Sequence, residues 1–172
     1  MRKGRELRQI RIKFTGNVSP RLQKFVLGIL NHKDAAWQDP SSTNPLQFVS
    51  SCSSKEEAHI SLGFYKNDDI VTRLGAAFDG LSAAATRGAL PRDVYINFEN
   101  FTFPPSHFPS KQKYREYVIR HEVGHALGMN HIPSSSPGPC NVMTPQTIPL
   151  DCAANSQPTH EDKTHLRRNF YL

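Results

Sequence analysis

The chain has 172 residues, a net charge of +6 at pH 7, 37% hydrophobic residues and 21% charged residues. This length and composition are typical of one globular domain, which we expect to span residues 1–172. No stretch approaches the ~20 apolar residues that a membrane span needs, which excludes a membrane-spanning helix.

The N-terminal residues are the most strongly basic part of the chain. Residues 1–13 contain six Lys or Arg residues and one acidic residue, whereas the remainder is almost balanced in charge. No apolar segment follows Met1–Glu6, so we expect no signal peptide in this chain. The favoured interpretation is a solvated arm that leads into an edge strand. Docking to nucleic acid or to another acidic surface, and a remnant of precursor processing, are the alternatives.

A strand and a helix are predicted first. Arg8–Phe14 alternates apolar and polar residues, which is typical of a half-buried strand. Ser19 and Pro20 then mark a helix start, because serine caps helices and proline fits their first turn. Apolar residues follow at helical spacing on one stripe: Leu22, Phe25, Val26, Ile29 and Leu30.

The middle of the chain alternates loop signals with short apolar runs. Asp39–Pro45 is rich in Ser, Pro and Asn and is predicted to be a loop, and Lys66–Asp69 is predicted to be a turn. Three prolines between residues 104 and 109 interrupt regular structure before the next helix. The predicted strands are Leu46–Ser50, His59–Tyr65, a short edge strand at Arg73–Phe78, and Asp93–Phe98.

Two helices are predicted in the C-terminal part. Lys111–Leu127 carries apolar side chains on opposite sides, which is typical of a helix buried between layers. Thr159–Tyr171 is the final predicted helix, with Thr159 as its cap and two acids in the first turn, where they favour the helix dipole. Residues 129–158 lie between the two helices and show little periodicity.

The most specific pattern is H-E-x-x-H-x-x-G-x-x-H at residues 121–131. On a helix, His121 and His125 lie on one face and can reach one metal ion. In a continued helix, His131 would lie ~9 Å beyond His125, too far to share that ion. Gly128 can adopt the left-handed conformation that ends helices, so we expect a bend there that returns His131 to the other two histidines.

These residues predict a hydrolytic zinc site. Three histidine ligands leave the fourth position of a tetrahedral zinc ion for water, whereas structural zinc sites usually use four protein ligands. Glu122 can act as a general base toward the zinc-bound water without being a ligand itself. The alternatives are a structural zinc site, or histidines that only cap a core helix.

The same residues carry a resemblance to a known family. The pattern at residues 121–131 is the signature of the metzincin clan of zinc endopeptidases. Asn141–Pro145, which contains Met143, resembles the methionine turn of that clan, and residues 58–172 resemble its matrixin subgroup. Thr144 departs from the pattern, because matrixins usually carry tyrosine there. The chain is identified as a divergent, matrixin-like metzincin.

The resemblance implies an α+β fold of the metzincin type. It comprises a twisted mixed sheet, an N-terminal backing helix, an active-site helix and a small irregular C-terminal subdomain that ends in a helix. We expect the upper subdomain at about residues 9–128 and the lower one at about 129–172. The implied activity is that of a zinc-dependent endopeptidase with His121, His125 and His131 as ligands and Glu122 as catalytic base.

A peptide substrate is expected to add itself as a strand along Gly75, Ala76 and Ala77, whose small side chains let its backbone approach. The alternative is that these small residues pack under a loop. The specificity pocket is expected between the active-site helix and the segment after Met143, with Ile148–Leu150 as wall residues. One catalytic zinc ion is predicted. The sequence leaves calcium open, because no loop for calcium or for a second zinc can be placed on it.

The three cysteines help to predict the cellular compartment of the protein. Cys140 and Cys152 bracket the methionine turn, and a disulfide between them would fix the floor of the site. Such a disulfide would indicate an oxidising compartment and favour a secreted protein. Cys52 would then remain as a small buried thiol.

A peptide or protein substrate is the expected partner, and the protein is expected to be a monomer. Three other functions stay open on the sequence alone. They are a catalytically weak module that binds zinc and peptides, a protease that docks on nucleic acid through its basic N-terminal arm, and a zinc hydrolase of non-peptide amides.

Overall fold

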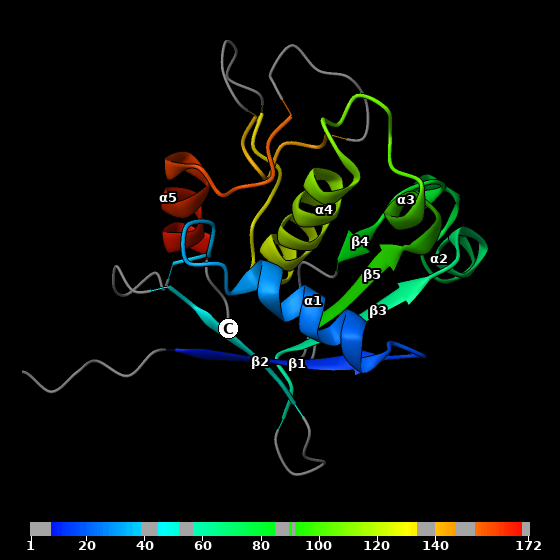
Figure 1. Ribbon diagram of the computed structural model, residues 1–172, viewed down its shortest axis with the longest axis horizontal. Coiled ribbons are helices and arrows are strands. Elements are labelled where there is room, and N and C mark those ends of the chain that lie inside the picture. Colours follow the sequence, from blue (N-terminus) through cyan, green and yellow to red (C-terminus); the bar gives the residue numbers. More distant parts are fainter. Residues whose placement is uncertain are drawn as a thin grey trace, which may run out of the picture.

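The structure is a computed structural model that describes residues 8–38, 45–51, 57–84, 90, 92–133, 140–146 and 154–169. Its centre is a twisted, mostly parallel sheet in the strand order β2-β1-β3-β5-β4 (Figure 1). The last strand, β4, pairs antiparallel with β5 and forms an edge of the sheet. The strands are β1 (Gln9–Thr15), β2 (Gln47–Ser50), β3 (Ile60–Tyr65), β4 (Ala83–Ala84) and β5 (Arg92–Asn97).

Two helices pack beside each other on this sheet. Helix α1 (Pro20–Leu30) begins where Leu22 N donates to Ser19 Oγ over 3.3 Å. Helix α4 (Lys111–Ala126) is capped in the same way by Ser110. Helix α4 contacts β4 and β5, whereas α1 contacts β2 at the other edge. The core between them is formed by apolar side chains of the sheet and both helices.

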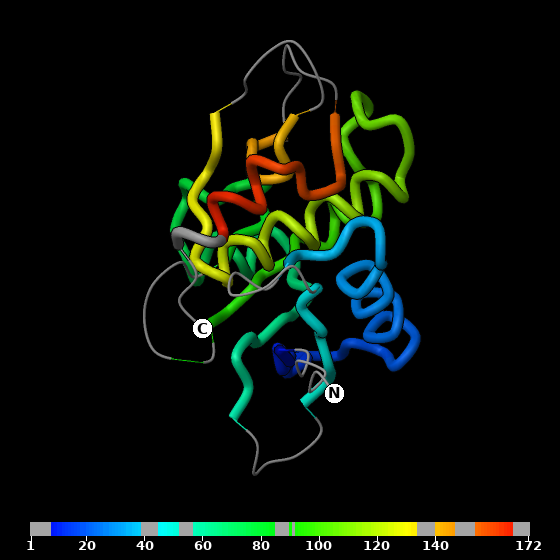
Figure 2. The backbone as a smooth tube through the Cα atoms, turned by 90° about the vertical axis from the view of Figure 1, so that its left-hand side faces the viewer, coloured from blue at the N-terminus to red at the C-terminus, as the bar shows by residue number. Residues whose placement is uncertain are grey.

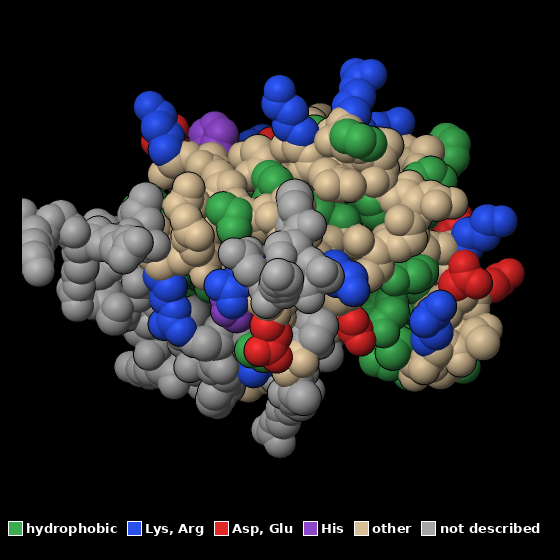
Figure 3. Space-filling model, turned by 90° about the horizontal axis from the view of Figure 1, so that it is seen from below, with side chains coloured by type: hydrophobic (Ala, Val, Ile, Leu, Met, Phe, Trp, Pro, Cys, Tyr) green, Lys and Arg blue, Asp and Glu red, His purple; other side chains and the backbone are tan. Residues whose placement is uncertain are grey.

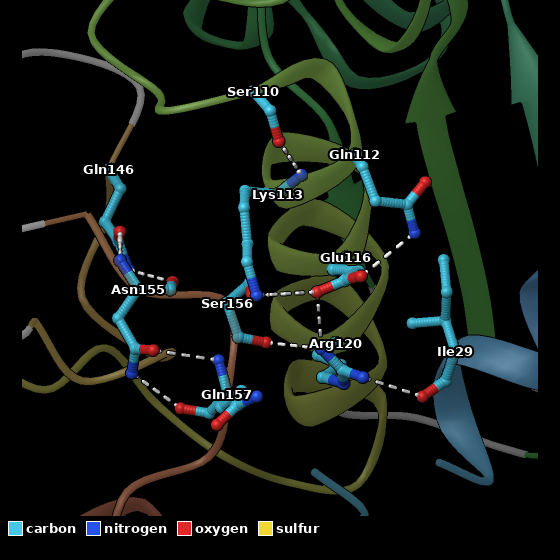
Figure 4. Close-up of polar contacts among 10 residues, drawn as sticks. All are labelled: Ile29, Ser110, Gln112, Lys113, Glu116, Arg120, Gln146, Asn155, Ser156 and Gln157. Atoms are coloured by element: carbon cyan, nitrogen blue, oxygen red, sulfur yellow. Dashed lines mark hydrogen bonds and ion pairs between the residues drawn. The ribbon is translucent and has the colours of Figure 1, made fainter.

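The C-terminal part lies against α4 and ends in α5 (His160–Asn169) (Figure 2). A buried arginine connects these layers (Figure 4). The Nη1 of Arg120 donates to Ser156 O over 2.6 Å, and its Nη2 donates to Ile29 O over 2.9 Å. Glu116, one turn earlier on α4, lies 3.6 Å from the same guanidinium group. Arg120 therefore holds α4 between α1 and the segment that precedes α5.

The predicted fold class is confirmed, since the structure combines a mixed sheet with a backing helix, a central helix and a C-terminal helix. Every predicted strand has an observed counterpart except Arg73–Phe78. The last predicted residue of the 93–98 strand instead opens a short helix, α3 (Phe98–Thr102), which is capped by Asn97.

Two predictions before the edge strand were wrong. Lys66–Asp69 is not a turn, because helix α2 (Asn67–Leu74) begins there with two acids in its first turn. The predicted edge strand at Arg73–Phe78 is also absent: Gly75 ends α2 with φ +100°, and a 3₁₀ helix, η1 (Ala76–Phe78), follows. Gly75, Ala76 and Ala77 therefore form no strand. The edge is formed by β4, which pairs with β5 on the side opposite to β3.

Two further predictions concern a membrane-spanning helix and the basic N-terminal arm. No helix among the described residues is long and apolar enough to span a membrane. On the face shown in Figure 3, the Lys and Arg side chains are dispersed and several lie near Asp or Glu. The basic residues before Arg8 lie outside the described residues.

Candidate metal centre and cleft

Helix α4 places the first two histidines of the motif on one buried face. His121 and His125 are one turn apart, and their Nε2 atoms lie 3.1 Å from each other. Glu122 follows His121 and is only 5% exposed. The helix continues unbroken to Ala126, so its regular geometry alone fixes the spacing of these three side chains.

The chain bends after α4 and brings the third histidine back. Gly128 has φ +103°, and Met129 N donates to Gly124 O over 3.0 Å, which closes the helix end. The ring of His131 then lies 4.7 Å from that of His125 and 5.3 Å from that of His121, between ring centroids. One nitrogen from each of the three rings lies within 4.8 Å of the others. The predicted bend at Gly128 is confirmed.

The hydrogen bonds of the two helical histidines fix their tautomers. His121 Nδ1 lies 2.7 Å from Val142 O, and His125 Nδ1 lies 2.7 Å from Met129 O. A carbonyl oxygen only accepts, so both Nδ1 atoms carry the proton and donate it. The two Nε2 atoms then present bare lone pairs to each other. Ligands of a tetrahedral zinc ion lie about 3.3 Å apart at usual Zn–N distances, so this donor set fits zinc.

Burial keeps all three imidazoles neutral. Desolvation lowers the pKa of His121 well below 6.5, and it lowers the pKa of His125 to about 4. The pKa of His131, which is more exposed, is also lowered by burial. A neutral imidazole offers the lone pair that a metal needs, whereas an imidazolium ion offers none. At neutral pH the three rings are therefore available as ligands.

Glu122 lies in the same buried environment. Desolvation raises its pKa to about 8. A nearby divalent cation acts in the opposite direction, because it stabilises the carboxylate. Desolvation and a cation shift the pKa of Glu122 in opposite directions, so its carboxyl group is suited to exchanging protons near neutral pH.

The turn around Met143 supports two of the three histidines. Its Val142 carbonyl accepts from His121, and its Met143 carbonyl accepts from Ile132 N over 3.1 Å, next to His131. Thr144 Oγ1 donates to Ile132 O over 2.8 Å. Met143 is fully buried beneath α4, close to Gly124. The Met143 turn thus connects the two helical histidines with the segment that carries His131.

A cavity of about 420 Å³ opens beside the three histidines. One wall is formed by β4 and the residues before it, which include Phe78 and Leu81. The opposite wall is α4, with Tyr114, Tyr117 and Val118 beside His121 and Glu122. The cavity therefore joins the histidine cluster to the edge strand β4 of the sheet.

Comparison with known proteins assigns the family. Residues 26–170 match the matrixin family. This chain belongs to the matrixin family. It resembles the crystal structure of archaemetzincin from Methanopyrus kandleri with a TM-score of 0.52 and 16% identity, over 95% of each chain. No curated protein matches.

Family membership makes the chain a member of the zinc metallopeptidases, and the archaemetzincin likeness confirms the metzincin type of fold. The metal that this family implies is zinc, and the histidine cluster matches its preference for nitrogen ligands. Within the described residues, this cluster is the one group of three or more His, Cys, Asp or Glu side chains that could hold a metal ion.

Several predicted residues lie outside the described part of this matrixin. They include the wall residues Ile148–Leu150 and the cysteines Cys52 and Cys152. Cys140 is buried and disulfide-bonded. The predicted Cys140–Cys152 pairing stays a prediction.

Asp162 is a site residue whose role the sequence did not reveal. Its fully buried carboxylate accepts from Val142 N over 2.9 Å, from Met143 N over 3.1 Å, and from Thr159 N and Oγ1. The sequence indicated Asp162 only as a first-turn acid of the last helix. Its contact with a turn 20 residues earlier is tertiary and leaves no local signal.

Asp162→Asn is expected to destabilise this matrixin by about 2 kcal/mol, because the new amide would face backbone N–H groups that need an acceptor. The zinc affinity should fall as well, since the Val142 peptide orients His121. Urea unfolding and zinc titration measure the two effects. The control is Asp34→Asn at an exposed position, and equal stability of the two variants would contradict the role of Asp162.

Gly124→Ala is expected to destabilise the protein by about 1–3 kcal/mol, as overpacking does. An added Cβ would lie 2.4 Å from Met143 Sδ and 3.0 Å from Trp37 Cζ2, and both side chains are fully buried. Gly28 in α1 is the matched control, because its Cβ would meet nothing within 4 Å. Gly28→Ala should stabilise by about 0.5–1 kcal/mol. Thermal unfolding that shows the same sign for both would refute this packing.

Proposed function

We propose that this matrixin is a zinc-dependent endopeptidase in which His121, His125 and His131 bind one zinc ion through nitrogen. The observation that carries the proposal is the pair of bare Nε2 atoms 3.1 Å apart, with the third imidazole beside them. A zinc ion held there would supply Lewis acidity, lowering the pKa of a coordinated water toward ~7 and polarising a carbonyl group.

Glu122 is the proposed general base. Its carboxylate takes the proton from the attacking water and delivers it to the nitrogen of the departing amine. Its position on α4, next to His121 and lining the same cavity, supports this role. Neutral histidines do not offset the charge of a divalent cation, so the cation would stabilise the ionised form of Glu122.

The substrate is proposed to be a peptide that pairs with the edge strand β4. Ala83 and Ala84 have small side chains and line the cavity, and among the described residues they pair with β5 on one side only. Backbone pairing at a sheet edge gives affinity without demanding a particular sequence, while side-chain pockets give selectivity. The edge that we predicted at Gly75–Ala77 is thus replaced by an edge a few residues later.

The disulfide at Cys140 supports an oxidising compartment, because cytosolic proteins rarely keep structural disulfides. We therefore propose a location outside the reducing cytosol.

The test is a mass-spectrometric cleavage profile on a broad peptide library. The zinc-loaded protein should cut internal peptide bonds, lose activity with a chelator and regain it when zinc is restored. Absence of cleavage by a protein that contains one zinc ion per chain would refute the endopeptidase and favour a module that only binds zinc and peptides.

A further inference from the structure

Three asparagines are joined around the loop that precedes β4. Asn67 begins α2, Asn97 ends β5, and Asn100 lies in α3. Asn97 Nδ2 donates to Asn67 Oδ1 over 3.1 Å, and Asn100 N donates to Asn97 Oδ1 over 3.1 Å. These three residues, which we call the asparagine clamp, connect the start of α2 with the end of β5 and with α3.

The clamp holds both backbone polar groups of one residue in the loop, Gly80. Gly80 N donates to Asn67 Oδ1 over 2.7 Å, and Asn100 Nδ2 donates to Gly80 O over 2.6 Å. Asn67 Nδ2 also donates to Asp79 Oδ1 over 2.7 Å. Gly80 has φ +70°, a conformation that glycine adopts without strain.

A further contact extends the clamp to the start of the edge strand. Asn97 is 1% exposed, and its backbone N–H donates to Ser82 Oγ over 2.9 Å. Ser82 directly precedes β4 and lines the cavity beside the histidines. The clamp therefore lies behind the wall of the cleft and touches none of the three histidines.

The backbone pairing of this wall is short among the described residues. There, strand β4 pairs with β5 at two positions, Ala83 with Tyr95 and Ala84 with Val94. Ala76 and Ala77 of η1 are exposed, and no residue of η1 is buried. The exposed part of the wall before β4 therefore depends on its hydrogen bonds to keep one shape.

We infer that Asn67, Asn97 and Asn100 are positioning residues that hold the β4 wall of the cleft in the geometry that an extended peptide requires. This inference rests on the proposed function. The wall binds the ground state and the transition state alike, so loosening it should raise KM and leave kcat unchanged. The effect should grow with the length of peptide that lies along β4.

The test compares Asn67→Ala and Asn100→Ala with Asn31→Ala. Asn31 is the control, because its side chain makes two backbone hydrogen bonds, both of 2.8 Å to Phe48, at the edge of the sheet far from β4. Each clamp variant should raise KM for an eight-residue substrate about tenfold, because this factor corresponds to the free energy of one lost hydrogen bond. KM for a blocked dipeptide, kcat and zinc content should stay unchanged.

Asn67 and Asn100 both bind the backbone of Gly80. The double variant of these two residues should therefore raise KM by less than the product of the two single effects. Hydrogen exchange over residues 76–84 should be faster in both clamp variants than in Asn31→Ala. Unchanged exchange, or equal KM changes for all three single variants, would overturn the inference. If the zinc-loaded wild type cleaves no peptide at all, the proposed function fails instead, and exchange alone then decides whether the clamp holds the wall.

Discussion

Glu122→Gln is expected to lower kcat/KM for peptide cleavage by ~10²–10⁴-fold, the usual contribution of a general acid–base. Glutamine has nearly the same volume as glutamate, but it cannot accept the proton of the attacking water. Zinc content should stay at one ion per chain, because Glu122 is not among the three imidazoles that form the ligand cluster. Peptide hydrolysis and metal analysis on the same sample measure both quantities.

The matched control is Glu116→Gln, on the same helix. Glu116 contacts Lys113 and Arg120 (Figure 4) and is not among the residues that line the cavity. This change should alter stability slightly and leave kcat/KM within a small factor of the wild type. Full activity of Glu122→Gln would remove the proposed base, whereas loss of zinc would show that Glu122 supports the metal instead.

His131→Ala is expected to weaken zinc binding by more than ~100-fold, since loss of a group that only orients a ligand already costs 10–100-fold. The two remaining imidazoles on α4 cannot complete a three-ligand site. Zinc titration against a competing chelator measures the affinity. The wild type should also gain thermal stability with zinc, by about 2.7 kcal/mol at a free concentration 100 times the dissociation constant.

The control for this change is His32→Ala at an exposed position after α1. It should keep the affinity and the zinc-dependent stabilisation of the wild type. If His131→Ala binds zinc as tightly as the wild type, the third ligand is not His131, and the bend at Gly128 serves another purpose.

The histidine cluster could be predicted because its determinants are local. The spacing of His121 and His125 is set by helix geometry, and Gly128 is the one residue between His125 and His131 that can take φ +103° without strain. Helix α1 was predictable for the same reason, since Ser19 caps it and its buried stripe follows the helical period.

The cleft wall could not be predicted, because its determinants are tertiary. Residues 73–78 form a short apolar run whose period does not separate strand from helix. Whether these residues form a strand is decided by Gly75, which ends α2, and by Gly80, whose backbone Asn67 and Asn100 bind from other elements. The support of the Met143 turn by Asp162 likewise joins residues that are far apart in the sequence.

Anomalous diffraction at the zinc edge, from crystals of zinc-loaded protein, tests the central claim most directly. We predict one peak per chain, bonded at about 2.0–2.1 Å to Nε2 of His121 and of His125 and to one ring nitrogen of His131. A peak elsewhere, or a fully loaded site in which the ring of His131 does not contact the metal, would contradict the account.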